Sequence, residues 1–368
     1  MALSVGIVGL PNVGKSTLFN ALLQSAKASA ANYPFCTIEP NIGAVEVPDS
    51  RLYHLAKLER SKKVTPTFIE FVDIAGLVRN ASKGEGLGNQ FLANIREVDA
   101  IAMVLRCFEH PDVVHVEGSV DPVRDAQIID LELIAKDLET VEKRLEKVEK
   151  LTRLGDKKSK EELEVLKLIR SFLEDMKPLR RCLRELTPEV VDYAKKTLFL
   201  LTVKPLMYVA NVGETDLPQG NKWSQKVIDY AKEEGAPVVV ICAKLEEELI
   251  GLNPDEKEEL LRSYGLEEPG LNRLIREAYK LLDLITFFTA GEKESRAWTV
   301  KRGTKAPQAG GKIHSDFERG FIAAEVINYE DYLKAGSVSK AKEMGLVRLE
   351  GKDYEIKDGD IVYFRFNV

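Results

Sequence analysis

The first 120 residues alternate between two patterns of apolar positions, one typical of strands and the other of helices. Short runs rich in β-branched residues predict strands, and the stretches between them have the pattern of helices. Such alternation is typical of an α/β domain with a largely parallel sheet. The runs that predict strands are 3–8, 42–47, 67–72 and 100–107.

The pattern changes between residues 121 and 200. Apolar residues recur at three- and four-residue steps with Glu and Lys between them, as in a heptad seam, and residues 155–158 interrupt the repeat. It predicts an antiparallel helical hairpin whose seam is its core. Because acids and bases are mixed, we expect the charges to form a solvated face rather than a nucleic-acid stripe. The seam positions are Leu131, Ile134, Leu138, Val141, Leu145, Val148, Leu166, Ile169, Leu173 and Met176.

The α/β pattern resumes after the hairpin, with apolar runs at 206–210 and 237–241. The hairpin is therefore expected to be inserted into the α/β domain. Strand-like runs at 283–289, 321–327 and 361–366 predict a separate small domain. The predicted domains are 1–122 together with 203–280, the inserted hairpin over 123–202, and a C-terminal domain over 282–368.

The turn after the first predicted strand carries a phosphate-binding motif. Residues 9–16 fit the pattern G-x-x-x-x-G-K-[ST], with a predicted strand before them and a predicted helix after them, as the motif requires. Gly9 and Gly14 let the backbone approach an anion without a Cβ in the way. Lys15 can reach the β- and γ-phosphates, and the Ser16 hydroxyl can take one place on Mg²⁺.

Two further segments are candidates for contacts with the metal and the γ-phosphate. The strand ending at Val72 runs into Asp-x-x-Gly, in which Asp73 can hold Mg²⁺ through a water and the Gly76 N–H can meet the γ-phosphate. Thr37, in a loop with two prolines, is either a switch residue that closes on the metal or a turn threonine. Many GTPases orient the attacking water with a glutamine where this chain has Leu77, so hydrolysis is expected to be slow or to use another group.

His115 is one candidate for that group. It follows the strand predicted at 100–107, where the loops of α/β sheets surround the ligand. A neutral imidazole could accept a proton or orient water there. The alternative is a surface or structural histidine.

The loops after 206–210 and 237–241 lie where a G-domain recognises its base. The usual guanine-binding sequence is Asn-Lys-x-Asp, in which the Asp carboxylate accepts two N–H groups of guanine. Here Asn211 is followed by Val212 in place of the Lys and Glu214 in place of the Asp. Because adenine has an acceptor at N1, losing this pair is expected to relax specificity or favour adenine, with Asn211 and Val212 near the base.

Composition narrows the classes of function. The net charge of −6 excludes a basic nucleic-acid coat, so such a contact would need a local patch. Residues 295–315 contain several basic residues and no acid, with Trp298 among them and Phe317 just beyond. They suit RNA binding, and a solvated loop with core aromatics is the alternative. The scattered cysteines are expected to be reduced thiols, and neither a secretory leader nor a membrane span is expected.

Several longer strings resemble the YchF family of Obg-like ATPases. The match covers nearly the whole chain, and these strings are far more specific than the phosphate loop alone. They are GLPNVGKST (9–17), NYPFCT (32–37), DIAGLV (73–78), GEGLGN (84–89), HVEGSVDP (115–122), FFTAG (287–291) and GTKAPQA (303–309).

The resemblance implies a P-loop G-domain of the translation-factor class with an inserted helical coiled coil and a C-terminal TGS domain, which is a β-grasp module. It implies an enzyme that binds and hydrolyses ATP, often GTP too, with Mg²⁺, and that associates with ribosomes and RNA. Asn12 also matches an asparagine that supports K⁺ binding in related G-domains, so K⁺ is a candidate second cation. By position, the resemblance assigns phosphate binding to Asn12, Val13, Gly14, Lys15, Ser16 and Thr17, Mg²⁺ ligation to Ser16 and Thr37, proximity to the base to Asn211 and Val212, and a part in hydrolysis to His115.

Together these patterns predict a cytosolic Mg²⁺-dependent nucleoside triphosphatase that prefers ATP. Water would attack the γ-phosphate while Lys15 and Mg²⁺ stabilise the developing charge. One alternative is a nucleotide-gated RNA or ribosome adaptor whose hydrolysis is incidental. The other is a strict GTPase of ribosome assembly, against which Val212 and Glu214 argue. The sequence does not indicate an oligomeric state.

Overall fold

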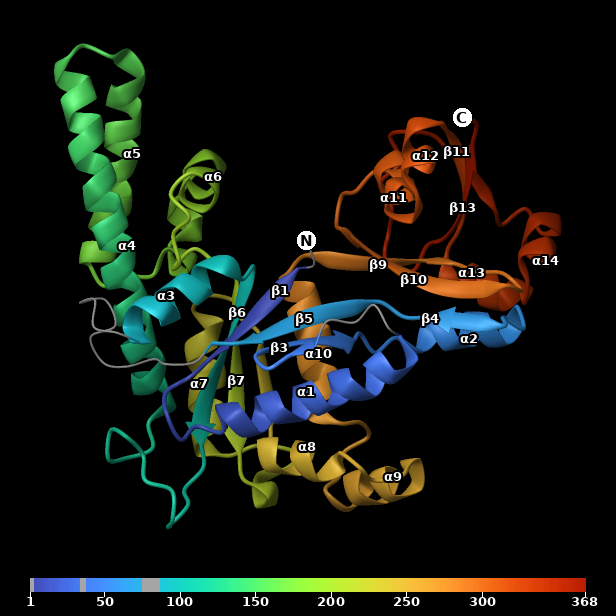
Figure 1. Ribbon diagram of the computed structural model, residues 1–368, viewed down its shortest axis with the longest axis horizontal. Helices are drawn as coiled ribbons and strands as arrows, with labels where there is room; N and C mark the ends of the chain where they lie inside the picture. The colour runs from blue at the N-terminus through green and yellow to red at the C-terminus, as the bar shows by residue number, and fades with distance from the viewer. Residues whose placement is uncertain (1–2, 34–37, 75–86) are drawn as a thin grey trace. The chain divides into compact units, whose positions relative to one another are not determined.

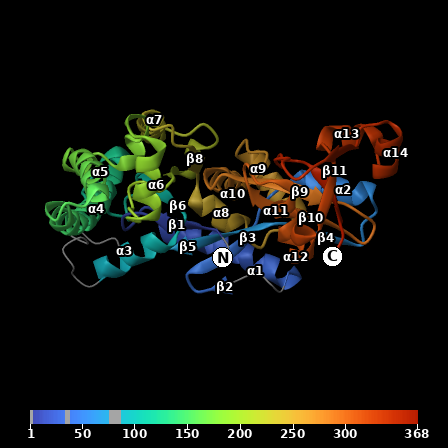
Figure 2. The ribbon, with the colours of Figure 1, turned by 90° about the horizontal axis from the view of Figure 1, so that it is seen from above.

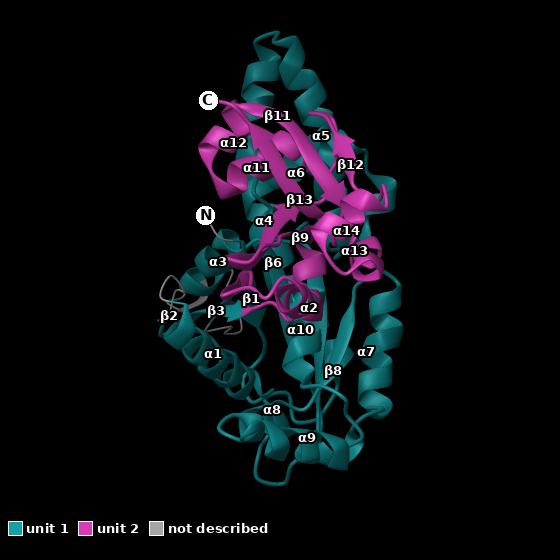
Figure 3. Ribbon diagram, turned by 90° about the vertical axis from the view of Figure 1, so that its right-hand side faces the viewer, with its two compact units in different colours: residues 1–45, 70–278 teal, residues 46–69, 279–368 magenta. Residues whose placement is uncertain are grey.

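The computed structural model describes residues 3–33, 38–74 and 87–368 (Figure 1). The chain divides into two compact units, residues 1–45 with 70–278 and residues 46–69 with 279–368 (Figure 3). This division differs from the predicted domains, because residues 46–69 belong to the C-terminal unit and the helical hairpin belongs to the α/β unit. The predicted α/β fold class is confirmed.

The first unit is built on a sheet that has seven strands among the described residues, in the order β2-β3-β5-β1-β6-β7-β8. Strands β5, β1, β6, β7 and β8 are parallel, and β2 and β3 form an antiparallel pair. All residues of β1 and β6 are buried, as expected for central strands covered on both faces. The strands are β1 Ser4–Val8, β2 Ile38–Glu39, β3 Ile42–Glu46, β5 Phe68–Asp73, β6 Ala100–Cys107, β7 Leu206–Val212 and β8 Val238–Ile241.

Helices lie on both sides of this sheet (Figure 2). Helix α1 follows β1 directly, and α8 follows β8, so both begin at the carboxyl edge of the parallel strands, where α/β proteins bind their ligands. The helices are α1 Lys15–Asn32, α3 Leu87–Glu97, α7 Lys222–Lys232, α8 Ala243–Leu249, α9 Pro254–Ser263 and α10 Gly270–Leu281.

The predicted helical hairpin is present as α4 (Pro122–Arg153) and α5 (Lys157–Glu174), which pack side by side (Figure 1). Most of the predicted seam is buried in one apolar cluster that also includes residues of α6 (Pro188–Lys196). Two predicted seam positions are wrong, because Leu131 is 46% exposed and Met176 is 61% exposed. The first turns of α4 bury Ile129 and Leu133 instead, and Met176 lies beyond the last residue of α5. The buried seam residues are Ile134, Val141, Leu145, Val148, Leu166, Ile169 and Leu173.

Two buried polar clusters fix the base of the hairpin. The Asp137 carboxylate accepts hydrogen bonds from the backbone N–H groups of Leu201 and Thr202, each at 2.8 Å. The Arg180 guanidinium pairs with Asp130 at 2.6 Å and with Glu234 at 2.9 Å, and all three groups are buried. A buried cation therefore has carboxylate partners here, which lowers the cost of its burial.

The second unit has a sheet in the order β12-β11-β13-β9-β10-β4. Strand β13 is parallel to β9, while β9 with β10 and β11 with its two neighbours are antiparallel. Within residues 279–368, the first strand, β9, and the last, β13, lie side by side at the centre of the sheet, as the expected β-grasp arrangement requires. The elements are α2 Ser50–Leu58, β4 Lys63–Thr65, β9 Leu284–Thr289, β10 Glu294–Lys301, α11 Ala306–Ile313, α12 Ser315–Arg319, β11 Phe321–Ile327, α13 Tyr329–Ala335, α14 Val338–Glu343, β12 Arg348–Glu350 and β13 Ile361–Phe366.

Residues 46–69 join the second unit through both backbone and side chains. Strand β4 pairs with β10, and Leu52 and Leu55 of α2 lie in the same buried cluster as Phe288 and Tyr332. The basic stretch at 295–315 is not an open loop, since most of it forms β10 and α11. Trp298 packs on the core of this unit and donates a hydrogen bond to Thr289 Oγ1 at 2.9 Å.

The three cysteines within the described ranges are buried thiols. Cys107, Cys182 and Cys242 are free and buried, and burial raises the pKa of Cys107 to about 12. None of the described helices combines the length and the apolar character that crossing a membrane requires.

Candidate nucleotide-binding site

The segment between β1 and α1 turns tightly, and Asn12 (φ 64°) and Gly14 (φ 94°) are both in the left-handed region. A Cβ on Gly14 would lie 2.1 Å from Nδ2 of Asn211, so the loop requires glycine here. Gly14 is the N-cap of α1, and no side chain caps this helix. The free N–H groups of the first turn, together with the helix dipole, make this end of α1 suited to an anion.

Lys15 and Asp73 are brought together at this loop. Lys15 is the first residue of α1 and Asp73 is the last of β5, which lies beside β1 with Asp73 opposite Ile7. The Lys15 ammonium forms an ion pair with the Asp73 carboxylate, and the two side chains are 14% and 23% exposed. A cation and a carboxylate therefore meet next to the helix N-terminus.

The remaining predicted phosphate and metal residues divide into two groups. Ser16 is exposed and Thr17 half-buried in the first turn of α1, while Val13 is buried. Thr37, Gly76 and Leu77 lie outside the described residues. Within the described ranges, no three His, Cys, Asp or Glu side chains gather as a metal site would need. A metal bound here would rely on hydroxyl groups and Asp73.

Asn211 links the phosphate loop to the loop that follows β8. Its Nδ2 donates to the carbonyl of Val13 at 2.9 Å, and its Oδ1 accepts from the N–H of Ala243 at 3.0 Å. Both polar atoms of this buried side chain are thus used inside the protein, and the Val212 side chain is buried as well. Asn211 therefore ties the two loops together, and it keeps a second N–H on Nδ2 and a second lone pair on Oδ1.

Glu214 stands where a guanine-binding aspartate would be, and it has a cation beside it. The Lys244 ammonium lies 3.0 Å from the Glu214 carboxylate, and the Tyr264 hydroxyl lies 3.5 Å from its other oxygen. The carboxylate raises the pKa of Lys244 through hydrogen bonding and charge. A guanine edge would have to share this carboxylate with Lys244.

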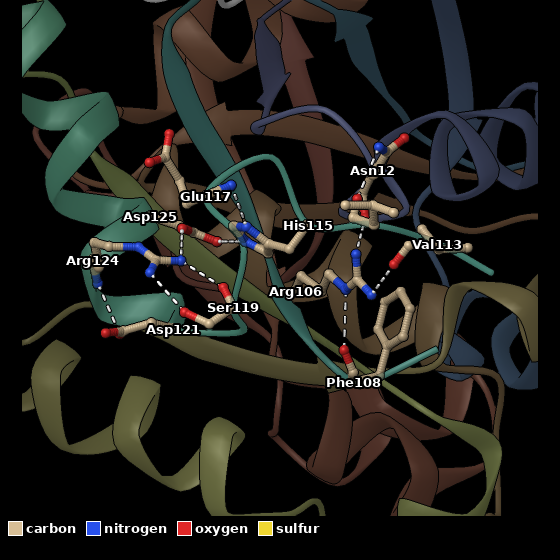
Figure 4. A network of polar contacts seen from close by, with 11 residues as sticks. Asn12, Arg106, Phe108, Val113, His115, Glu117, Ser119, Asp121, Arg124 and Asp125 are labelled. Atoms are coloured by element: carbon tan, nitrogen blue, oxygen red, sulfur yellow. Dashed lines mark hydrogen bonds and ion pairs between the residues drawn. The ribbon is translucent and has the colours of Figure 1, made fainter. Parts of the chain in front are cut away.

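His115 is buried and paired, the arrangement expected if it is the structural histidine of the two alternatives (Figure 4). Its Nδ1 accepts from the N–H of Glu117 at 2.9 Å, so its Nε2 carries the proton and donates to Asp125 at 2.6 Å. The His115 and Asp125 side chains are 3% and 0% exposed. Burial raises the pKa of Asp125, while His115 and Arg124 act to lower it. With both ring nitrogens engaged, His115 in this arrangement cannot take a proton from water.

Sequence reasoning missed Arg106, which lies on β6 opposite Asn211 on β7. Its Nε donates to the carbonyl of Phe108 at 3.1 Å, its Nη2 to that of Val113 at 2.7 Å, and its Nη1 lies 3.5 Å from that of Asn12 (Figure 4). The guanidinium also covers the Phe108 ring at 4.7 Å. The one available signal was a charged residue inside an otherwise apolar strand.

Comparisons with known proteins show the family to which the chain belongs. A family model described as a 50S ribosome-binding GTPase matches residues 4–150, and the model YchF-GTPase_C, described as a protein of unknown function (DUF933), matches residues 284–367. The "Ribosome-binding ATPase YchF" of Bacillus subtilis is 55% identical over 370 residues and that of Haemophilus influenzae 53% over 368, each covering 100% of both chains. The chain belongs to the YchF family.

A solved YchF structure is similar throughout. The structure of the Schizosaccharomyces pombe YchF GTPase matches with a TM-score of 0.89 and 39% identity, covering 99% of this chain and 98% of that one. The YchF relatives thus extend over both compact units and the helical hairpin. The names of these relatives differ in the nucleotide, since the bacterial proteins are called ATPases and the yeast protein a GTPase.

Proposed function

We propose that this chain is a Mg²⁺-dependent nucleoside triphosphatase that prefers ATP, also takes GTP, and works in the cytoplasm at the ribosome. Membership of the YchF family makes it a nucleotide-hydrolysing enzyme. The observation that carries the site is the uncapped N-terminus of α1, with Gly14 in the left-handed region and Lys15 beside Asp73. This arrangement suits a polyphosphate and its metal.

In this proposal the residues around α1 divide the work. Lys15 exchanges the Asp73 carboxylate for β- and γ-phosphate oxygens and stabilises charge there as water attacks. Ser16, Thr37 and Asp73 hold Mg²⁺, which would neutralise phosphate charge when bound. Asn12 to Thr17 surround the phosphates, the Gly76 N–H meets the γ-phosphate, and Asn12 helps to hold K⁺. Leu77 offers no hydrogen bond to the attacking water, so intrinsic turnover is slow.

The preference for ATP rests on Glu214. Its pairing with Lys244 at 3.0 Å competes with the two N–H groups through which guanine would bind a carboxylate. The buried Val212 stands where the guanine-binding sequence has a Lys, so the contact of that Lys with the base is absent as well. The name ATPase on the bacterial relatives supports the same direction.

The ribosome is proposed as a partner because the bacterial relatives are named ribosome-binding ATPases, and RNA contact is proposed for the C-terminal unit. There the Arg296 guanidinium lies 4.0 Å from the centre of the Trp298 ring, and both residues are half-buried. Cation and ring together suit contacts with an RNA strand. We propose that this unit is a TGS domain, and the strand order of its sheet supports the assignment.

Calorimetry with Mg²⁺ and non-hydrolysable analogues of ATP and GTP tests the preference. We expect the ATP analogue to bind more tightly, and the double variant Val212→Lys with Glu214→Asp to reverse the order. The single variant Lys226→Ala, on exposed α7, is the control. Tight binding of the GTP analogue with no binding of the ATP analogue to the wild type would exclude the proposal.

A second candidate function is a nucleotide-gated ribosome adaptor whose hydrolysis is incidental, which the lack of a free water-orienting group at His115 favours. Single-turnover rates with and without ribosomes separate the two. An enzyme of the first kind is accelerated by ribosomes, whereas an adaptor binds ribosomes in a nucleotide-dependent manner with an unchanged rate.

We propose that His115 takes part in hydrolysis through Asp125. We expect His115→Ala to lower turnover more than nucleotide affinity, and we expect His115→Ala, Asp125→Ala and the double variant to be equally slow, because the pair acts as one unit. A free general base would give a different result. Its removal would cost about 10²-fold or more, while Asp125→Ala, which releases the imidazole, would keep or raise the rate. Wild-type turnover in His115→Ala would exclude any role.

A further inference from the structure

The Arg106 guanidinium is unusual among the buried charges of the first unit. The residue is 2% exposed, and within the described ranges no carboxylate forms an ion pair with it. Its close partners are backbone carbonyls and the face of the Phe108 ring. Asp125 and Glu109 act on it only over a longer distance. Arg180, by contrast, has two carboxylates at hydrogen-bond distance.

A buried cation without a counter-charge is unfavourable, and arginine does not escape by losing its proton. Burial lowers the pKa of Arg106 without making it neutral. Carbonyl dipoles and an aromatic face offset only part of the cost of desolvation. An anion bound at the phosphate loop would supply negative charge nearby.

The position of Arg106 connects this charge to the phosphate loop. Its bonds to Phe108 and Val113 hold the segment 108–113 in a turn. The next carbonyl, that of Val114, accepts a hydrogen bond from Nδ2 of Asn12 at 3.1 Å, and Arg106 itself approaches the Asn12 carbonyl (Figure 4). Asn12 has a left-handed backbone, so it depends on such outside contacts to stay in place.

We propose that Arg106 is a positioning residue for the nucleotide triphosphate: it fixes Asn12 of the phosphate loop through the 108–114 turn, and the bound phosphates balance its charge in place of a protein carboxylate. The inference rests on the proposed function, since it requires that a nucleotide binds at this loop. It adds a cation to the site that no phosphate-loop motif contains.

The test compares di- and triphosphate binding in Arg106→Met, Arg106→Gln and Arg106→Lys. Calorimetry uses Mg²⁺ with ADP and with a non-hydrolysable ATP analogue. Arg106→Met should weaken the ATP analogue by about tenfold or more and ADP by less, because attraction to a cation grows with the charge of the ligand. Arg106→Gln should also reduce the difference in affinity between the ATP analogue and ADP, and it replaces the methionine variant in the test if that variant does not fold. Arg106→Lys keeps the charge and should preserve the ratio of the two affinities.

Arg181→Met is the matched control. Arg181 also lies over an aromatic ring, that of Tyr230 at 3.9 Å, and also donates to a backbone carbonyl, but it has carboxylate partners and lies at the base of the hairpin. It should lower thermal stability and leave the ratio of ATP-analogue to ADP affinity unchanged. An equal loss of both nucleotides in Arg106→Met, or no loss, would overturn the inference. Failure of the wild type to bind either nucleotide would instead overturn the proposed function, and the inference with it.

Discussion

Lys15→Ala is expected to remove nearly all phosphate-dependent nucleotide binding. In the proposed complex the ammonium donates charge-assisted hydrogen bonds to β- and γ-phosphate oxygens, each of which contributes about 1.5–3 kcal/mol. Loss of two such bonds corresponds to a fall in affinity of about 10²–10⁴-fold. The variant should fold normally, because the pair with Asp73 is partly exposed and such pairs contribute little to stability.

Calorimetry with Mg²⁺ and a non-hydrolysable ATP analogue measures this effect. Lys27→Ala is a matched control, since Lys27 is an exposed lysine further along α1. It should bind the analogue as the wild type does. Unchanged affinity in Lys15→Ala, with a folded protein, would show that the nucleotide does not bind at this loop.

Asn211→Ala is expected to weaken both ATP and GTP analogues together. The substitution leaves the Val13 carbonyl and the Ala243 N–H without their partner in a buried place, which costs about 1–3 kcal/mol for each group. Two loops then lose their common attachment, so we expect a loss of about tenfold or more in nucleotide affinity. Because the side chain acts by holding the two loops together, we expect it to affect both nucleotides alike, and the preference between the two bases should not change.

The ratio of the two affinities is therefore the decisive measurement. Asn253→Ala removes a different asparagine side chain, the N-cap of α9, and should cost only about 1 kcal/mol of stability with no change in nucleotide binding. A shift of base preference in Asn211→Ala would show that this side chain contacts the base directly. That result would restore the direct role that the sequence pattern suggested.

The parts that could be predicted depend on neighbours in the chain. The phosphate loop is recognisable because Gly9, Gly14 and Lys15 are spaced by the geometry of one turn, and the strands β1 and β6 because burial on both faces gives continuous apolar runs. The helical hairpin follows from a periodicity that any long packed helix must have.

The parts that could not be predicted depend on contacts between distant residues. Whether His115 faces water or Asp125 depends on how the segment 108–121 turns back on α4, and no local pattern encodes that turn. Asn211 was placed near the base by position, but its amide is used by Val13, 198 residues earlier in the chain. Residues 46–69 joined the C-terminal unit through pairing of β4 with β10, which is equally remote in sequence.

The His115–Asp125 pair has a mechanical consequence for α4. Asp125 lies in the first turn of a helix of 32 residues, which is about 48 Å long. A rigid rod of that length acts as a lever, and a rotation of about 5° at its base displaces its far end by about 4 Å. Any rearrangement of the segment between Arg106 and Asp125 would thus be magnified at the tip of the hairpin.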